Sequence, residues 1–406
     1  MKEVVAKMSE KTAFTFAPGL EGVVATRTRL SNVDGAAGRL VIAGFSVEEL
    51  AGRASFEETL YLLWNGALPN LEELAALRRD LAALRALSPI TRDVLEAAAA
   101  KKVSPMDALR MASGTLGSGE GDDRDDALRL VAAFPTIVAV YWRLSQGKEP
   151  VEPRPELSHA ANYLYMLSDE VPSTEQVRAL ETYLNTVSDH GMNASTFTTR
   201  VIVSTRSDLV SAVVGAVGAL KGPLHGGAPG PALDVVFEIG EASHAEPYLR
   251  AKLDRGERLM GFGHRVYKVR DPRADVLASA AERLYATDAD RDLYRLALEV
   301  EKTAIRLLKE YKPGRNLDTN VEFYTALLLH GLGLPAELFT PTFAAGRVAG
   351  WTAHCFEQRK LDRLIRPQSE YVGVEDSAWK PVEERQPCQE REERMSGEAT
   401  ERDQRG

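Results

Sequence analysis

Two histidines lie beside glycines, in segments where the backbone can approach a ligand closely. His225 lies in residues 221–228, Lys-Gly-Pro-Leu-His-Gly-Gly-Ala, which follow an apolar run at 209–220. His264 lies in residues 260–267, Met-Gly-Phe-Gly-His-Arg-Val-Tyr. Glycine permits sharp turns, and a neutral imidazole donates a hydrogen bond to a ligand. A buried structural histidine is the alternative at 225, and that segment alone does not decide between the two.

A guanidinium group follows the second histidine closely. Asp271 is a good helix cap and Pro272 a good first-turn residue, so Arg273 is expected in the first turn of a helix. A cation beside exposed helix amides binds carboxylate or phosphate well. The alternative is a surface arginine paired with an acidic neighbour.

The acidic candidate is Glu322, in residues 316–324, Asn-Leu-Asp-Thr-Asn-Val-Glu-Phe-Tyr. A carboxylate in such a position can act as a general base. Thr319 and Glu322 also have the spacing of a capping box, in which both side chains only satisfy amides at a helix start. Taken by itself, the spacing favours the capping box.

Three further polar residues have unusual surroundings. His190 lies among small and polar residues at 188–196, which favour either ligand contact or tight helix packing. Arg347 is surrounded by small residues at 343–351 in a pattern typical of a buried helix, where a cation needs an anionic partner. Arg366 precedes a proline in a segment expected to be extended, where an ordinary surface arginine is the alternative.

The elements that must position these residues are mostly helical. From Phe56 onward the apolar residues recur at helical spacing, and Ser104 with Pro105 predicts a capped helix start. Strand-forming runs are almost absent after residue 50, whereas residues 12–47 predict a short hairpin or two with a turn at 32–35. The pattern predicts a mostly helical chain with minor β elements near the N-terminus and makes a parallel α/β sheet unlikely.

Composition excludes several classes of function. The chain has 406 residues and a net charge of −9, without a basic stripe, so nucleic-acid binding is not expected. The apolar run at 210–220 is taken as the longest and is too short to span a membrane. Two cysteines, Cys355 and Cys388, and no His-x-x-x-His pair indicate neither a disulfide framework nor a metal site. With no signal sequence, a reduced, cytoplasmic protein is expected.

Taken together, these segments resemble the citrate synthase family. The matching residues occur in the family's order along nearly the whole chain. They are Gly19–Val23, Asp34–Gly35, His190–Phe197, Ser204–Asp208, Gly222–Ala228, Gly261–Lys268, Asp271–Arg273, Asn320–Tyr324 and Arg366–Pro367.

The resemblance implies a two-domain, all-α homodimer that belongs to the tricarboxylic acid cycle. A large domain would comprise residues 1–225 and 332–385, a small domain residues 226–331, and residues 386–406 a disordered charged tail. The implied reaction condenses acetyl-CoA with oxaloacetate and hydrolyses citryl-CoA to citrate and CoA. It needs no metal and no cofactor besides the CoA substrate.

The resemblance also assigns roles. Glu322 is the base that enolises the thioester, His225 the donor to its oxygen and His264 the donor to the oxaloacetate carbonyl. His190, Arg273 and Arg347 bind the oxaloacetate carboxylates, together with Arg366 from the other subunit. The residues expected to contact CoA are Met260, Gly261, Phe262, Gly263, Arg258, Lys268, Lys312 and Arg315.

One position departs from the family pattern. The usual base is aspartate, and Glu322 adds a methylene that the site must absorb, since a misplacement near 1 Å costs about 10²-fold in rate. Two alternatives stay open. One is 2-methylcitrate synthase, which uses propionyl-CoA; the other is a non-catalytic paralogue that binds CoA or citrate.

Overall fold

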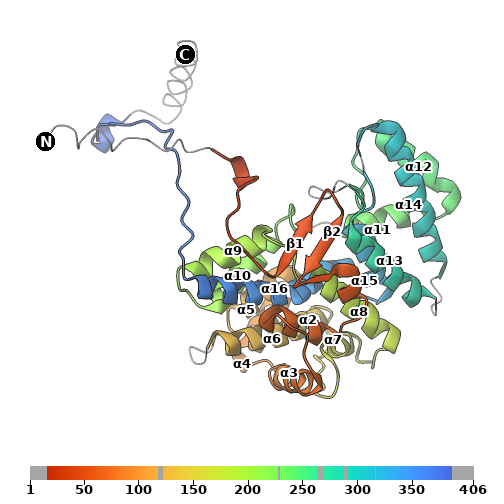
Figure 1. Ribbon diagram of the computed structural model, residues 1–406, viewed down its shortest axis with the longest axis horizontal. Coiled ribbons are helices and arrows are strands. Elements are labelled where there is room, and N and C mark those ends of the chain that lie inside the picture. The colour runs from red at the N-terminus through yellow and green to blue at the C-terminus, as the bar shows by residue number, and fades with distance from the viewer. Residues whose placement is uncertain are drawn as a thin grey trace, which may run out of the picture. The chain divides into compact units, whose positions relative to one another are not determined.

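The computed structural model describes residues 16–117, 122–226, 229–263, 267, 269–286, 291–315 and 317–385. Contacts divide the chain after Ile365 into two units. Of the residues that the structure describes, the first unit contains every long helix (Figure 1). Only a short turn of helix, η4 (Val382–Glu384), is assigned in the described part of the second, where Arg385 lies over the ring of Trp379.

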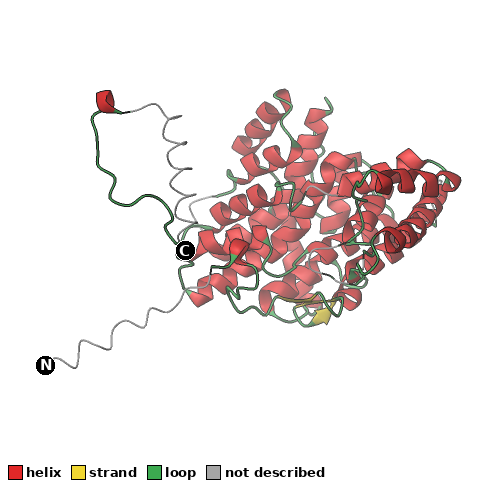
Figure 2. Cartoon of the chain, turned by 90° about the horizontal axis from the view of Figure 1, so that it is seen from above, coloured by secondary structure: helices red, strands yellow, loops and turns green. Residues whose placement is uncertain are grey.

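Helices make up most of the first unit, as Figure 2 shows. They are η1 (Pro18–Leu20), α1 (Val47–Ala51), α2 (Phe56–Asn65), α3 (Leu71–Ala83), α4 (Pro89–Ala100), α5 (Pro105–Ser113), α6 (Asp123–Ser145), α7 (His159–Ser168), α8 (Thr174–Val187), α9 (Ala194–Ser204), α10 (Leu209–Leu220), α11 (Pro229–Ile239), η2 (Ala242–His244), α12 (Ala245–Asp254), α13 (Pro272–Tyr285), α14 (Arg291–Tyr311), α15 (Val321–Gly331), η3 (Ala336–Leu338) and α16 (Phe339–Leu361). The all-α prediction is confirmed.

Local chemistry sets many of the helix starts. The Ser104 side chain accepts the amide of Asp107 at the start of α5, with Pro105 in the first turn, as predicted. Asn193 caps α9 and Asp208 caps α10 in the same way. Each cap satisfies an amide that has no partner within the helix.

The three short strands form one antiparallel sheet near the N-terminus, in the order β1 (Ser31–Asp34), β2 (Arg39–Ile42) and β3 (Phe45–Ser46). The predicted hairpin is present, but its turn lies at residues 35–38 and not at 32–35, because Asn32 pairs with Val41 in the ladder. The Asp34 carboxylate accepts the amides of Ala36 and Ala37 and so closes this turn.

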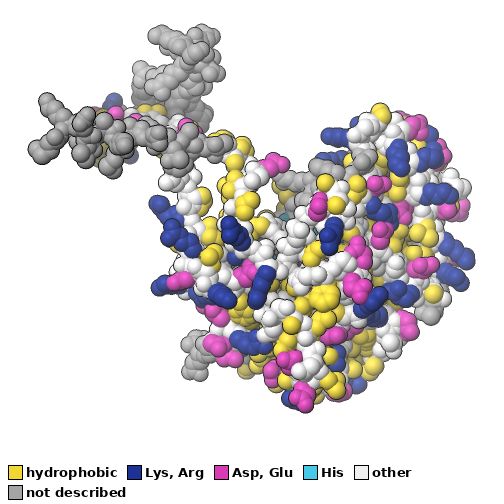
Figure 3. All heavy atoms as spheres, viewed as in Figure 1, with side chains coloured by type: hydrophobic (Ala, Val, Ile, Leu, Met, Phe, Trp, Pro, Cys, Tyr) yellow, Lys and Arg dark blue, Asp and Glu magenta, His cyan; other side chains and the backbone are white. Residues whose placement is uncertain are grey.

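Two long helices run through the core of the first unit. α16 packs against α6, α8 and α9. By length and hydropathy α6 could span a membrane, but 78% of its most apolar 18-residue stretch is buried inside the protein. The expectation that residues 210–220 are the longest apolar stretch was therefore wrong. On the face shown in Figure 3, acidic and basic side chains are interspersed.

The segment from α11 to α15 carries several of the candidate site residues. Within it α13 packs against α15 and α11 against α15, while α13 also contacts α8 and α1. Contacts place residues 16–365 in a single unit and do not divide it further. The predicted domain boundaries at residues 225 and 331 therefore stay a prediction. The predicted tail at 386–406 lies outside the described residues.

Candidate active site

Backbone pairing joins the glycine loop at 260–263 to the segment that precedes Glu322. Phe262 and Thr319 form an antiparallel bridge, and the amide of Gly263 donates to the Asp318 carbonyl at 2.8 Å. The Asn320 side chain donates to the Gly263 carbonyl, also at 2.8 Å. A Cβ at residue 263 would lie 2.9 Å from the Leu317 side chain, and its φ of +78° is one that glycine adopts readily. The loop and the start of α15 are therefore held together.

Glu322 lies in the first turn of α15, and its carboxylate is not used to cap the helix. The helix cap is Asn320, whose side chain accepts the Glu322 amide at 2.9 Å, whereas the Thr319 hydroxyl donates to Glu301. The capping-box alternative is therefore wrong. Within the described chain, the Glu322 carboxylate has no hydrogen bond or ion pair. Burial raises its pKa, with Arg273 opposing and Asp271 reinforcing the shift.

A second carboxylate, Glu301 of α14, ties the surrounding segments together. It is 8% exposed and accepts hydrogen bonds from Arg270 at 2.8 Å and from Thr319 and Tyr324 at 2.5 Å. Thr319 and Tyr324 flank Glu322 in sequence, and Arg270 precedes the start of α13. Glu301 thus fixes both helix starts relative to each other.

Arg273 lies at the start of α13, as the sequence predicted. The Asp271 side chain caps the helix by accepting the Arg273 amide and also accepts the guanidinium, with Nη2 to Oδ2 at 2.7 Å. Arg273 is 5% exposed, and its guanidinium carbon lies 5.7 Å from the centre of the Tyr267 ring. Burial acts to lower its pKa, but Asp271 outweighs this and raises it. The cation is buried, oriented and charged.

Arg347 lies in the middle of α16 and is 1% exposed. Its Nε donates to the Val187 carbonyl at 2.5 Å, and no described carboxylate lies within ion-pair distance. Burial lowers its pKa to about 10, Arg273 adds to this shift and Asp189 opposes it. Two buried guanidinium groups that repel each other make a strong site for an anion with more than one carboxylate.

His225 follows α10 and is only partly buried. Its Nε2 lies 2.8 Å from the Ser195 hydroxyl, which also accepts the indole N–H of Trp351 at 3.1 Å. Burial and the charge of Arg347 lower the pKa of His225 to about 4. The imidazole is therefore neutral near pH 7 and carries one N–H donor.

His190 lies between α8 and α9, and its Nε2 is 3.0 Å from the hydroxyl of Tyr267. The two rings meet edge to face with their centres 5.8 Å apart. Because Tyr267 also lies beside Arg273, it links two of the predicted oxaloacetate ligands. Sequence reasoning gave Tyr267 no role in the site; a polar side chain directly after the predicted catalytic loop was the available signal.

The structure leaves other predicted site residues outside this cluster. His264 and Lys268 lie outside the described residues, and Arg366 belongs to the second unit. Met260, Gly261, Phe262 and Gly263 form the loop joined to residues 318–320. The cationic side chains predicted to contact CoA, namely Arg258, Lys312 and Arg315, are exposed. No group of three potential metal ligands occurs among the residues that the structure describes.

Comparison with known proteins shows which family this chain belongs to. The family model "Citrate synthase, C-terminal domain" matches residues 19–368. The chain belongs to the citrate synthase family. Citrate synthase 2 of Bacillus subtilis is 42% identical over 375 residues, covering 90% of this chain and 98% of the relative. A 2-methylcitrate synthase of Shewanella oneidensis is 38% identical over 384 residues, covering 93% of this chain and all of the relative.

A solved citrate synthase has the same fold. It is the ternary complex of carboxymethyl coenzyme A and oxaloacetate with the enzyme from the thermophilic archaeon Thermoplasma acidophilum. The likeness has a TM-score of 0.81 at 30% identity and covers 91% of this chain and 100% of the other. As a member of the citrate synthase family the protein is an acyltransferase that acts on an acyl-CoA and oxaloacetate.

Proposed function

We propose that the protein condenses acetyl-CoA with oxaloacetate and hydrolyses the resulting citryl-CoA, with Glu322 as the base. The observation that carries the proposal is an uncommitted carboxylate, Glu322, whose pKa is influenced by the buried cation Arg273. A non-catalytic binding protein has no need of such a carboxylate. Glutamate in place of the family's aspartate is thereby compatible with catalysis.

The first step removes a proton from the methyl group of the thioester. The Glu322 carboxylate accepts that proton while the N–H of neutral His225 donates to the thioester oxygen, where negative charge develops. The lowered pKa of His225 supports this role, because a neutral imidazole keeps its donor without adding a positive charge.

In the second step the enol carbon attacks the oxaloacetate ketone. Arg273, Arg347 and His190 hold the two carboxylates, and His264 donates to the carbonyl oxygen. Two buried guanidinium groups match the double negative charge of oxaloacetate. Water then cleaves the citryl thioester to citrate and CoA. In this scheme side chains supply all the acid–base chemistry, so no cofactor is required.

The proposal includes a homodimer in which Arg366 of one subunit reaches the oxaloacetate of the other. Arg366 is exposed in the structure. Mixing two inactive variants tests this arrangement. Arg366→Ala subunits mixed with Glu322→Gln subunits should recover activity, because some mixed dimers contain one complete site. Recovery no greater than the sum of the two separate preparations would disprove the shared site.

Thiol release from acetyl-CoA with and without oxaloacetate tests the base. Glu322→Gln should lower kcat by about 10²- to 10⁴-fold, the usual contribution of a positioned base, while oxaloacetate still binds. Glu337→Gln, which removes another acidic group in η3, is the matched control and should leave kcat unchanged. Undiminished turnover in Glu322→Gln would refute the assignment.

The same assay separates acetyl-CoA from propionyl-CoA. One methylene in an acyl pocket discriminates by only about 1–3 kcal/mol, and relatives of both kinds are similarly identical to this chain. We propose acetyl-CoA because Phe323 and Tyr324, which follow Glu322, resemble the citrate-forming members. A higher kcat/KM for propionyl-CoA would reverse this choice in favour of 2-methylcitrate synthase.

A further inference from the structure

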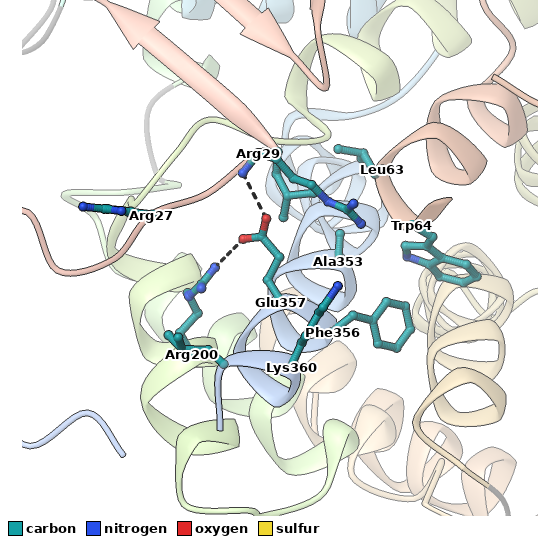
Figure 4. Close-up of a pocket in the computed structure, with 11 residues that line it drawn as sticks. Arg27, Arg29, Leu63, Trp64, Arg200, Ala353, Phe356, Glu357 and Lys360 are labelled. Atoms are coloured by element: carbon teal, nitrogen blue, oxygen red, sulfur yellow. Dashed lines mark hydrogen bonds and ion pairs between the residues drawn. The ribbon is translucent and has the colours of Figure 1, made fainter. Parts of the chain in front are cut away.

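A pocket of about 410 Å³ lies beside the C-terminal end of α16 and shares no lining residue with the site described above. Its lining includes Arg29, from the segment before β1, and Lys360, from α16 (Figure 4). In Figure 4 the Arg29 side chain points toward Trp64, whereas the Lys360 side chain points away from the ring of Phe356. Both are exposed, and neither side chain forms an ion pair with a described carboxylate.

Glu357 is the one acidic residue among the described residues that line the pocket, and its carboxylate already accepts hydrogen bonds from the protein. The Glu357 carboxylate accepts the amide of Arg29 at 3.0 Å, the hydroxyl of Thr28 at 2.8 Å and the guanidinium of Arg200 at 2.9 Å. Burial alone would raise the pKa of Glu357, but these hydrogen bonds hold it below its ordinary value. Arg29 and Lys360 therefore present positive charge that this carboxylate does not neutralise.

Buried hydrogen bonds connect the pocket to the residue next to His190. Arg200 is 1% exposed and its Nη1 donates to Nδ1 of His354 at 2.8 Å. Since arginine has no acceptor, Nδ1 of His354 accepts and its Nε2 donates to Asp189 at 3.0 Å. Asp189 also accepts from Ser31, whose hydroxyl in turn accepts the amide of Gly191 at 2.7 Å. Both neighbours of His190 in the chain are thus held by this network.

We propose that the pocket binds a phosphate monoester with a flat or apolar organic part, and that this binding weakens the affinity for oxaloacetate. Arg29 and Lys360 bind the phosphate, and the rings of Trp64 and Phe356 contact the apolar part. An anion beside Glu357 competes for Arg200. Loss of the Arg200–His354 contact then loosens Asp189 and, with it, His190.

Binding is tested first, by isothermal titration calorimetry with phenyl phosphate as the probe. The double variant Arg29→Ala/Lys360→Ala should bind at least about tenfold more weakly, because two charge-assisted contacts are lost. Arg79→Ala, which removes an exposed arginine on α3, is the matched control and should bind normally. Inorganic phosphate and phenol, each lacking half of the ligand, should bind more weakly than phenyl phosphate. Phthalate, an aromatic dicarboxylate, should also bind more weakly; tighter binding of phthalate would show that the pocket prefers carboxylates to phosphate.

Equal affinity of the double variant and the native protein would overturn the pocket assignment. So would a double variant that dissociates into monomers while phenyl phosphate affinity stays unchanged, because the pocket would then be a protein contact. Neither outcome depends on turnover, so this arm is independent of the proposed function.

The coupling to oxaloacetate rests on the proposed function and is tested separately. Saturating phenyl phosphate should raise the KM for oxaloacetate at least about fivefold in the native enzyme and not in the double variant. In Glu322→Gln, which does not turn over, linkage requires oxaloacetate to weaken phenyl phosphate binding by the same factor by which phenyl phosphate weakens oxaloacetate binding to that variant. His354→Gln should bind phenyl phosphate without this effect. Binding that leaves the oxaloacetate affinity unchanged would overturn the coupling.

Discussion

Replacing Glu301 with glutamine tests whether one buried carboxylate positions the catalytic base. Glu301 accepts three hydrogen bonds, from Arg270, Thr319 and Tyr324, and is 8% exposed. Glutamine keeps the shape but replaces one acceptor oxygen with an NH₂ group, which faces a donor, and removes the negative charge opposite Arg270.

The expected loss follows from these contacts. A hydrogen bond to a charged group contributes about 1.5–3 kcal/mol, so Glu301→Gln should lose about 2–3 kcal/mol of unfolding free energy. Because Thr319 and Tyr324 flank Glu322, a shift near 1 Å at the base should also lower kcat by about 10²-fold. Glu299→Gln is the matched control, since Glu299 is exposed on the same helix and pairs with Lys302 only at 3.9 Å.

The assay combines calorimetric melting with steady-state thiol release for both variants. A Glu301→Gln protein that melts and turns over like Glu299→Gln would show that the three hydrogen bonds do not position Glu322. A lower melting temperature with unchanged kcat would restrict Glu301 to a role in stability.

Three further predictions concern pH and packing. Glu322 must be ionised to accept a proton, and burial raises its pKa, so kcat/KM should fall as the pH drops through a value above the ordinary glutamate pKa. The Glu322→Asp variant should keep this loss of activity at low pH. The Glu322→Gln variant, which has no carboxylate at this position, should not show it. Burial raises the pKa of Glu181 to about 7, so the folded state loses stability as pH rises from the unfolded value of about 4.3 toward 7; Glu181→Gln should melt higher than the native protein at pH 8 but not at pH 4. A Cβ at Gly350 would lie 2.2 Å from the Ser188 carbonyl, so Gly350→Ala should lose about 1–3 kcal/mol in denaturant unfolding, whereas Gly218→Ala, with its nearest contact at 3.9 Å, should gain about 0.5–1 kcal/mol.

Local patterns determined much of the fold. Helical spacing, the helix cap at Ser104 and the scarcity of strand-forming residues after residue 50 predicted a mostly helical chain, and the structure confirms it. The helix start at Asp271, Pro272 and Arg273 was predicted because a cap and a first-turn proline act within a few residues. The order of motifs along the chain indicated the citrate synthase family, which the comparisons confirm.

Other features depend on contacts between distant residues. Thr319 and Glu322 have the spacing of a capping box, yet Thr319 bonds to Glu301 and Asn320 caps the helix instead. The sequence could not reveal this, because the competing acceptor comes from another helix. The roles of His264 and Arg366 stay predictions.

The sequence by itself determined which residue types were available and which helices would carry them. The tertiary structure alone decided that Arg347 lies close enough to Arg273 and His225 for its own pKa to be lowered by Arg273 and for the pKa of His225 to be lowered by Arg347. It also decided that Tyr267 joins His190 to Arg273. The physical reason is that electrostatic and hydrogen-bond energies depend on distances in space, which the packing of α13, α15 and α16 sets and local sequence does not.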